Sequence, residues 1–338
     1  MCQVIGGDKM ATFQSVKMLI KAHLENDTTT FRRVALQIAA KESNAGHTKI
    51  SKEIKELIEN TPSRVGQSAG AIISSKRKAN VNVEQLLTSN YPTDNLKDMV
   101  LNTKTKDELV RLLLEWRQRR NLESYGLNCR KKILLTGPPG CGKTMSASVI
   151  AGELTLPLFV VKLEGLISRY LGETSIHLKN IFDMMESTPG VYLFDEFDSI
   201  GSTRGDSKEV GEIRRILSSF LIMLEEFNGD SIIVAATNYE NNLDWALFRR
   251  FDSVIKYTKP TKEECIGLIK LKIRNFEVEK IDWNNIVTYA EGLSYAEITK
   301  ATMEAIKTTI LNNNNVLTEQ LLALALRQRK NMYTIKDI

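Results

Sequence analysis

The sequence predicts an α/β fold in which short apolar strands alternate with helices between residues 93 and 259. Four apolar runs carry this prediction, and they lie at residues 133–135, 158–161, 191–194 and 232–236. Short runs that are apolar at every position are typical of strands buried on both faces of a parallel sheet. Because helical patterns separate the runs, we expect repeated βαβ units and a parallel sheet between two layers of helices.

Helical patterns flank this region on both sides. Before it, apolar residues recur at helical spacing in three short segments between residues 10 and 60, and Thr61-Pro62 ends the last of them. After it, the chain has only helical patterns. We therefore expect a helical N-terminal domain for a substrate or partner at 1–62, a linker at 63–92, the α/β domain at 93–259 and a helical lid at 260–338.

Composition and charge are those of an ordinary globular protein. The 338 residues are 42% hydrophobic and 26% charged, and the net charge of +5 is too small to argue for nucleic acid. No run reaches the ~18 apolar residues of a membrane helix, and residues 1–10 do not resemble a signal peptide. The four cysteines form no C-x-x-C pair, which disfavours a zinc site or a disulfide framework. We expect a cytoplasmic protein without a membrane segment.

A glycine-rich segment between the first apolar run and the next helix matches the pattern G-x-x-x-x-G-K-[ST]. It comprises Gly137, Pro138, Pro139, Gly140, Cys141, Gly142, Lys143 and Thr144, and Met145 follows it. Glycines let backbone N–H groups surround a polyphosphate, and the helix amino terminus adds partial positive charge. We expect Lys143 to reach the β- and γ-phosphates of ATP and the hydroxyl of Thr144 to bind Mg²⁺.

The third apolar run ends in two adjacent carboxylates, Asp195 and Glu196. Ligands of open α/β sheets bind at the carboxyl ends of the strands. We expect Asp195 to hold Mg²⁺ through water and Glu196 to act as the general base that polarises the attacking water. Asn238 ends the fourth run, where its amide could orient that water or the γ-phosphate.

These motifs resemble the AAA branch of the AAA+ ATPases, and the resemblance covers about residues 95–335. Residues 195–204 resemble the extended Walker B segment, 243–252 the second region of homology, and 292–298 the start of a lid helix. The resemblance implies a P-loop NTPase with a Rossmann-like α/β domain and a C-terminal helical lid. It also assigns Ala296 to the nucleotide site.

The resemblance further implies that the active form is a homo-oligomeric ring, for which the family suggests a hexamer. Asn238 corresponds to the sensor-1 residue, and Arg249 and Arg250 match the arginine-finger positions that reach the γ-phosphate of a neighbouring subunit. No Pro-Gly insertion separates the two arginines, which leaves open which of them acts. Tyr295 stands where the family usually has glycine, at a position expected beside the adenine or ribose.

The segment 167–173 resembles the first pore loop of the family, with Arg169, Tyr170 and Leu171 before a glycine. In the family this aromatic residue faces the central channel and grips an extended polypeptide. We therefore expect Tyr170 to contact a protein substrate, with Arg169 and Leu171 beside it. Residues 201–211 correspond to the second pore loop.

Three functions share this ATP site. The first is remodelling, unfolding or disassembly of a protein substrate through a central pore, which the pore aromatic favours. The second is a nucleic-acid loader or helicase, which we consider unlikely because the chain has no strong basic stripe or appended nucleic-acid motif. The third is an assembly scaffold that hydrolysis resets.

A proteolytic activity of the chain itself is not expected, because no H-E-x-x-H motif occurs. The N-terminal segment 19–47 is similar to the N-domains of small bacterial AAA ATPases. Some of those ATPases are paired with subtilisin-like proteases in anti-phage operons. This weaker resemblance suggests a partner protease and a role in defence.

Overall fold

The computed structural model describes most of the chain. The described residues are 15–22, 28–44, 47–59, 86–163, 174–198, 207–238, 245–312 and 316–334. The expected pore residues Arg169, Tyr170 and Leu171 lie outside these ranges, as do residues 63–85 of the expected linker. None of the helices in the described ranges has the length and apolar character that crossing a membrane requires.

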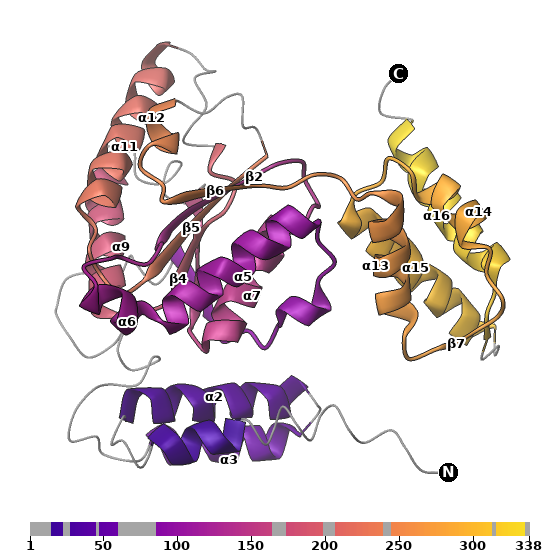
Figure 1. The fold of residues 1–338 in the computed structure, drawn as a ribbon, viewed down its shortest axis with the longest axis horizontal. Helices are drawn as coiled ribbons and strands as arrows, with labels where there is room; N and C mark the ends of the chain where they lie inside the picture. Colours follow the sequence, from indigo (N-terminus) through magenta and orange to yellow (C-terminus); the bar gives the residue numbers. More distant parts are fainter. Residues whose placement is uncertain are drawn as a thin grey trace.

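A mixed, mostly parallel sheet forms the centre of the α/β domain (Figure 1). Its strands, in spatial order, are β1 (Leu87–Asn90), β3 (Leu158–Val161), β4 (Val191–Phe194), β5 (Ile232–Thr237), β2 (Lys132–Thr136) and β6 (Ser253–Lys256). The pairs from β3 to β6 are parallel, and β1 pairs antiparallel with β3. The four apolar runs are all strands, which confirms the predicted α/β fold.

The sequence pattern does not predict two of the strands, β1 and β6, because they lie at the edges of the sheet. β1 falls inside the expected linker, and only Leu87 of its four residues is even partly buried. In β6, only Ile255 is buried. An edge strand is covered incompletely, so it does not need the continuous apolar run that marks a central strand.

Helices cover both faces of the sheet (Figure 1). One face packs against α5 (Thr103–Arg117) and α7 (Lys143–Leu154), and the other against α9 (Thr174–Ser187) and α11 (Ser207–Glu226). The short helix α6 (Arg119–Ser124) follows α5, and the short helix α12 (Trp245–Phe248) precedes β6. Alternate strand residues enter the two apolar clusters: Ile133 and Leu135 belong to one, and Leu134 belongs to the other.

Four helices follow the sheet as a separate bundle in Figure 1: α13 (Lys262–Ile273), α14 (Trp283–Ala290), α15 (Tyr295–Leu311) and α16 (Glu319–Thr334). We call this bundle the lid. Capping boxes begin α13 at Thr261 and α15 at Ser294. Such reciprocal hydrogen bonds fix where a helix begins. The lid also contains a pair of two-residue strands, β7 (Glu277–Val278) and β8 (Val316–Leu317), which the helical patterns do not predict.

Two N-terminal helices, α2 (Thr28–Asn44) and α3 (Thr48–Glu59), pack against each other (Figure 1). Residues 15–22 are also helical. The amide of Gln37 on α2 donates to the carbonyl of Pro92 at 3.3 Å. This bond links the helical pair to the segment that leads through the 3-10 turn Leu96–Asp98 towards α5.

Candidate functional site

The glycine-rich segment forms a loop between β2 and α7 at the carboxyl edge of the sheet. Gly137, Gly140 and Gly142 adopt φ angles of 136°, 72° and 96°, which L side chains rarely adopt. A Cβ atom on Gly137 would lie 2.3 Å from the carbonyl oxygen of Tyr257, and a Cβ atom on Gly140 would lie 2.7 Å from Ser294 Oγ. Glycine is therefore required here by conformation and by space.

Lys143 bends back over this loop. Its ammonium donates to the carbonyls of Gly137 at 2.6 Å and Pro138 at 2.8 Å, and to Asn238 Oδ1 at 2.8 Å. Three acceptors match the three hydrogens of a charged ammonium. Burial lowers the pKa of Lys143, and the carboxylates of Asp195 and Asp198 act in the opposite direction. The structure thus brings together Lys143, at the start of α7, and Asn238, directly after β5.

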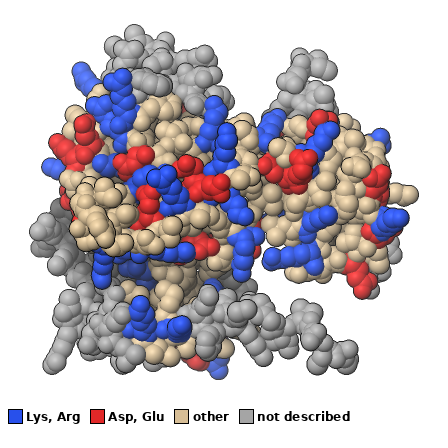
Figure 2. Space-filling model, in the orientation of Figure 1, with Lys and Arg blue, Asp and Glu red and all other residues tan. Residues whose placement is uncertain are grey.

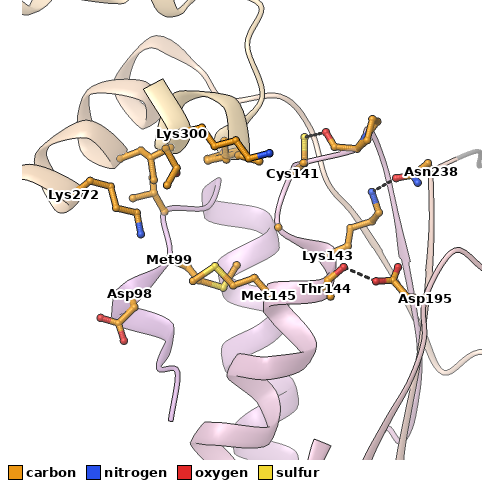
Figure 3. Close-up of a pocket in the computed structure, with 18 of the residues that line it drawn as sticks. Asp98, Met99, Cys141, Lys143, Thr144, Met145, Asp195, Asn238, Lys272 and Lys300 are labelled. Atoms are coloured by element: carbon orange, nitrogen blue, oxygen red, sulfur yellow. Dashed lines mark hydrogen bonds between the residues drawn. The ribbon is translucent and has the colours of Figure 1, made fainter. Parts of the chain in front are cut away.

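The two residues expected to bind a metal lie in direct contact. Thr144 Oγ1 donates to Asp195 Oδ2 at 2.7 Å, as the dashed line in Figure 3 marks. Both are hard oxygen donors, which is the type of ligand that Mg²⁺ takes in proteins. β4 delivers Asp195, and the first turn of α7 delivers Thr144.

Glu196 has an unusual backbone. Its φ angle is 51°, in the left-handed region that residues other than glycine rarely adopt. Its backbone N–H donates to Asp195 Oδ1 at 2.9 Å, and its side chain is exposed at the cavity wall. Strained residues cluster at functional sites. The turn places adjacent carboxylates in different surroundings, one half-buried and bonded to Thr144, the other open to the cavity.

Asp198 belongs to the same site, although the sequence analysis assigns it no role. Its Oδ1 accepts from Thr237 Oγ1 at 3.1 Å and from the backbone N–H of Asn238 at 3.3 Å. These bonds tie the end of β5 to the segment after β4 and so position Asn238. The sequence feature that could have indicated this role is that Asp198 is a third carboxylate, three residues after Asp195.

A cavity of about 510 Å³ lies between this loop and the lid. The loop and strand ends contribute Pro139, Gly140, Cys141, Gly142, Lys143, Thr144, Met145, Asp195, Glu196 and Asn238. Further lining residues are Asp98, Met99, Val100, Leu268, Lys272, Tyr295, Ala296, Thr299 and Lys300. The cavity therefore unites segments that lie far apart in the chain (Figure 3).

Direct contacts join the lid to the loop. The backbone N–H of Ala296 donates to the carbonyl of Gly140 at 3.0 Å. Tyr295 is buried beside it, and its hydroxyl donates to Glu264 Oε2 on α13 at 2.8 Å. Burial, with the neighbouring Glu264 carboxylate, raises the pKa of Tyr295. Tyr295 thus forms part of the cavity wall and braces two lid helices against each other.

Three residues of the glycine-rich segment have mainly structural contacts. Gly137 and Pro138 are absent from the described cavity lining, and they act through the carbonyls that accept from Lys143. Cys141 is 1% exposed, and burial raises the pKa of its thiol. A buried thiol with a raised pKa is a poor nucleophile.

Arg249 and Arg250 lie away from this cavity. They follow α12 and precede β6, whose first residue, Ser253, pairs with Ile133 near the start of β2. β2 separates this edge from the phosphate loop by roughly 13 Å, at about 3.3 Å per residue. Arg249 is exposed, and Arg250 Nε lies 3.3 Å from Glu225 Oε2.

Replacing Gly137 by Ala should strongly weaken the binding of a nucleotide at this loop. The added Cβ atom meets backbone rather than a movable side chain, so the loop and the Lys143 acceptors must shift. We expect the dissociation constant of ADP, measured by calorimetry, to rise about tenfold or more, as a strain of about 1–3 kcal/mol implies. Gly126→Ala is the matched control, because Gly126 has a φ angle of 73° but no atom within 4 Å of the added Cβ. Equal ADP affinities for the two variants would contradict the prediction.

Comparison with known proteins finds similarity to ATPases of one family. A model of the family described as "ATPase family associated with various cellular activities (AAA)" matches residues 133–259. An uncharacterized AAA family ATPase of Sinorhizobium fredii, y4kL, is 34% identical over 314 residues, which are 92% of this chain and 93% of that protein.

Two further relatives are longer proteins. The proteasome-activating nucleotidase of Thermococcus onnurineus is 32% identical over 205 residues, which are 59% of this chain and 52% of that protein. The ATP-dependent zinc metalloprotease FtsH 3 of Phytoplasma mali is 29% identical over 260 residues, which are 74% of this chain and 43% of that protein. The matched part of this chain thus spans about half of each of these relatives or less.

Proposed function

Because this chain belongs to the AAA family of ATPases, we propose that the cavity between its phosphate loop and lid binds ATP, and that hydrolysis there drives remodelling of protein substrates. The observation that carries the site assignment is the convergence of Lys143, Thr144, Asp195 and Asn238 on one cavity. Lys143 and Thr144 begin α7, Asp195 directly follows β4, and Asn238 directly follows β5. Their meeting supports one phosphate-binding centre.

Mg²⁺ would be held by Thr144 and Asp195. Their oxygens already lie 2.7 Å apart, and both suit a hard cation. A bound Mg²⁺ would neutralise part of the phosphate charge. In that state Asp195 would exchange its hydrogen bond from Thr144 for a contact to the ion or its water.

Glu196 is the proposed general base. Its exposed carboxylate lines the cavity, where it can accept a proton from water that attacks the γ-phosphate. Asn238 would orient that water or the γ-phosphate, and Asp198 would hold Asn238 in place. Lys143 would leave its loop acceptors and turn its ammonium to the β- and γ-phosphates.

A ring of subunits, which we propose to be a hexamer, would complete this site. Arg249 and Arg250 lie at the opposite edge of the sheet from the phosphate loop, so a subunit cannot direct them at its own γ-phosphate. If they act on a γ-phosphate, it would be that of a neighbouring subunit. An arginine supplied in this way stabilises the charge of the transition state.

Protein, rather than nucleic acid, is the proposed substrate. One relative is named a proteasome-activating nucleotidase and another an ATP-dependent metalloprotease, and both names concern protein degradation. On the described part of the face in Figure 2, basic and acidic side chains are interspersed rather than gathered into a basic stripe. Nucleic-acid grooves follow the phosphate backbone with positive charge, so this pattern favours protein.

A substrate trap tests the proposal. The Glu196→Gln protein should keep ATP bound while hydrolysis is slow, so a substrate engaged by the ring stays attached. After purification from native cells with ATP and Mg²⁺, we expect discrete proteins to co-purify and Tyr170→Ala in the same background to release them. Recovery of nucleic acid instead, or of the same proteins regardless of Tyr170, would overturn the remodelling function. ATPase activity of the single Tyr170→Ala variant checks that its nucleotide site is intact.

A further inference from the structure

A short segment before α5 supplies part of the cavity wall. We call residues 94–100 the wall segment, and its last three residues, Asp98, Met99 and Val100, line the cavity. In Figure 3, Asp98 and Asn238 lie at opposite ends of the cavity, and Met99 lies between them. The wall segment therefore lies away from the phosphate end of the cavity, which Asn238 marks.

The wall segment is held against the carboxyl end of α7. The backbone N–H of Leu96 donates to Glu153 Oε1 at 3.2 Å, and Arg117 donates to Glu153 Oε2 at 2.8 Å. The neighbouring Gly152 allows this close approach, because a Cβ atom there would lie 2.3 Å from the carbonyl oxygen of Asp94. The backbone of the wall segment thus packs directly on α7, and the Glu153 carboxylate fixes it through a charge-assisted hydrogen bond.

Internal hydrogen bonds make the wall segment a compact turn. The backbone N–H of Asn95 donates to Asp98 Oδ2 at 3.2 Å, and the backbone N–H of Asp98 donates to the carbonyl of Asn95 at 3.0 Å. The backbone N–H of Met99 donates to the carbonyl of Leu96 at 3.3 Å. A shift of Leu96 would therefore displace the cavity-lining residues that follow it.

One helix thus holds both the phosphate loop and the wall segment. Lys143 is the first residue of α7, and Glu153 lies in its last turn. Met99 lies close to the start of the same helix, since a Cβ atom on Gly142 would be 3.2 Å from Met99 Cε. Figure 3 shows Met99 beside the first turn of α7. The distance across the cavity therefore depends on the contact that Glu153 makes at the far end of the helix.

We propose that Glu153 is a positioning residue for the nucleotide, and that it acts through the backbone of Leu96 on the wall segment. This inference rests on the proposed assignment of the cavity to ATP. If the phosphates lie at Lys143, the wall segment contacts the nucleoside, which the apolar side chains of Met99 and Val100 suit. Glu153 is absent from the described cavity lining, so its loss should alter the nucleoside contacts without touching the phosphates.

Glu153→Ala in the full-length protein separates the two ends of the ligand. We expect the dissociation constant of ADP, measured by calorimetry, to rise about three- to tenfold, because the wall segment loses the hydrogen bond that fixes it. The inhibition constant of pyrophosphate in ATP hydrolysis should change by less than about twofold, since pyrophosphate needs only the phosphate end. The KM for ATP should rise, with kcat within about twofold. An equal loss for ADP and pyrophosphate would overturn the inference, because it would indicate that α7 as a whole is loosened.

Glu153→Gln is the conservative variant. Its amide oxygen can still accept from the backbone N–H of Leu96, so it should retain most of the ADP affinity. Glu123→Ala is the matched control, because Glu123 is an exposed carboxylate on α6 outside the cavity lining, and its ADP affinity should equal that of the unmodified protein. A Gln variant as weak as the Ala variant would show that the ion pair with Arg117 carries the effect, and would overturn the inference.

Gly152→Ala displaces the wall segment by a second route, which does not depend on the folding of the Glu153 variants. Its Cβ atom meets the backbone of Asp94, so we expect the same pattern of weaker ADP and unchanged pyrophosphate binding. Gly267→Ala is the matched control, because Gly267 also lies within a helix but its Cβ atom would be 3.7 Å from Val100 Cγ1, an ordinary contact. Equal ADP affinities of these two glycine variants would contradict the inference.

Lys143→Ala distinguishes failure of this inference from failure of the site assignment. If Lys143→Ala loses both ADP and pyrophosphate while Glu153→Ala binds ADP normally, the cavity holds the nucleotide and the inference alone fails. If Lys143→Ala binds both ligands normally, the site assignment fails, and the inference fails with it.

Discussion

Replacing Glu196 by Gln is expected to slow ATP hydrolysis by about 10²- to 10⁴-fold, the usual contribution of a general base, while ATP binding persists. The change removes the proton acceptor and leaves the side-chain volume unchanged. The backbone N–H that donates to Asp195 also remains. Because Gln and Glu have the same Cβ substituents, the left-handed backbone at φ 51° gains no new strain.

Steady-state phosphate release measures the rate, and calorimetry measures ADP binding. Glu186→Gln is the matched control, because Glu186 is an exposed carboxylate on α9 that lies outside the cavity lining. Its rate should be unchanged. A Glu196→Gln rate within threefold of the unmodified protein would show that another group accepts the proton. Loss of ADP binding together with hydrolysis would show that Glu196 mainly supports the loop.

Removing both Arg249 and Arg250 should produce the other large effect, a loss of about 10³- to 10⁵-fold in hydrolysis rate, which is the contribution that arginine fingers make in phosphoryl transfer. The expected loss arises between subunits, because these arginines lie at the opposite edge of the sheet from the subunit's own phosphate loop. ADP binding should therefore be nearly unchanged. Arg111→Ala, at a side chain that is 71% exposed on α5, controls for loss of a surface charge.

Mixing subunits tests the transfer between neighbours. The double arginine variant has an intact cavity, and Lys143→Ala has intact arginines, so mixed assemblies should regain activity that neither variant has alone. Full activity of the double variant, or no recovery on mixing, would contradict action in trans. Of the single variants, we expect Arg249→Ala to be slower, since Arg249 is exposed while Arg250 lies against Glu225 of its own subunit.

The central fold follows from local features of the sequence. Strands β2 to β5, which carry the site, are buried on both faces, and such strands must be apolar at nearly every position. The phosphate loop is also local, because a single continuous segment supplies its glycines, Lys143 and Thr144. Asp195 and Asn238 stand directly at strand ends, so the predicted parallel sheet sufficed to bring them to the same edge.

The remaining parts of the site depend on contacts between distant segments. Asp198 acts through hydrogen bonds across two strands, and the lid residues reach the cavity only because Ala296 docks on Gly140. Helical periodicity says which residues are buried within a helix bundle, but not which exposed side chains face another domain. Lys300 therefore has no sequence signal that separates it from other surface lysines.

The sequence alone determined the class of fold, the phosphate loop and the residues at the ends of its central strands, because each is encoded within a few adjacent positions. The tertiary structure decided the strand order, the edge strands, the cavity wall formed by the lid and the distance of Arg249 and Arg250 from that cavity. These features arise from packing between segments that are far apart in the chain. The pattern of residues in the sequence indicates which positions are buried and which local conformation they adopt. Which surfaces contact each other is decided only when the chain packs.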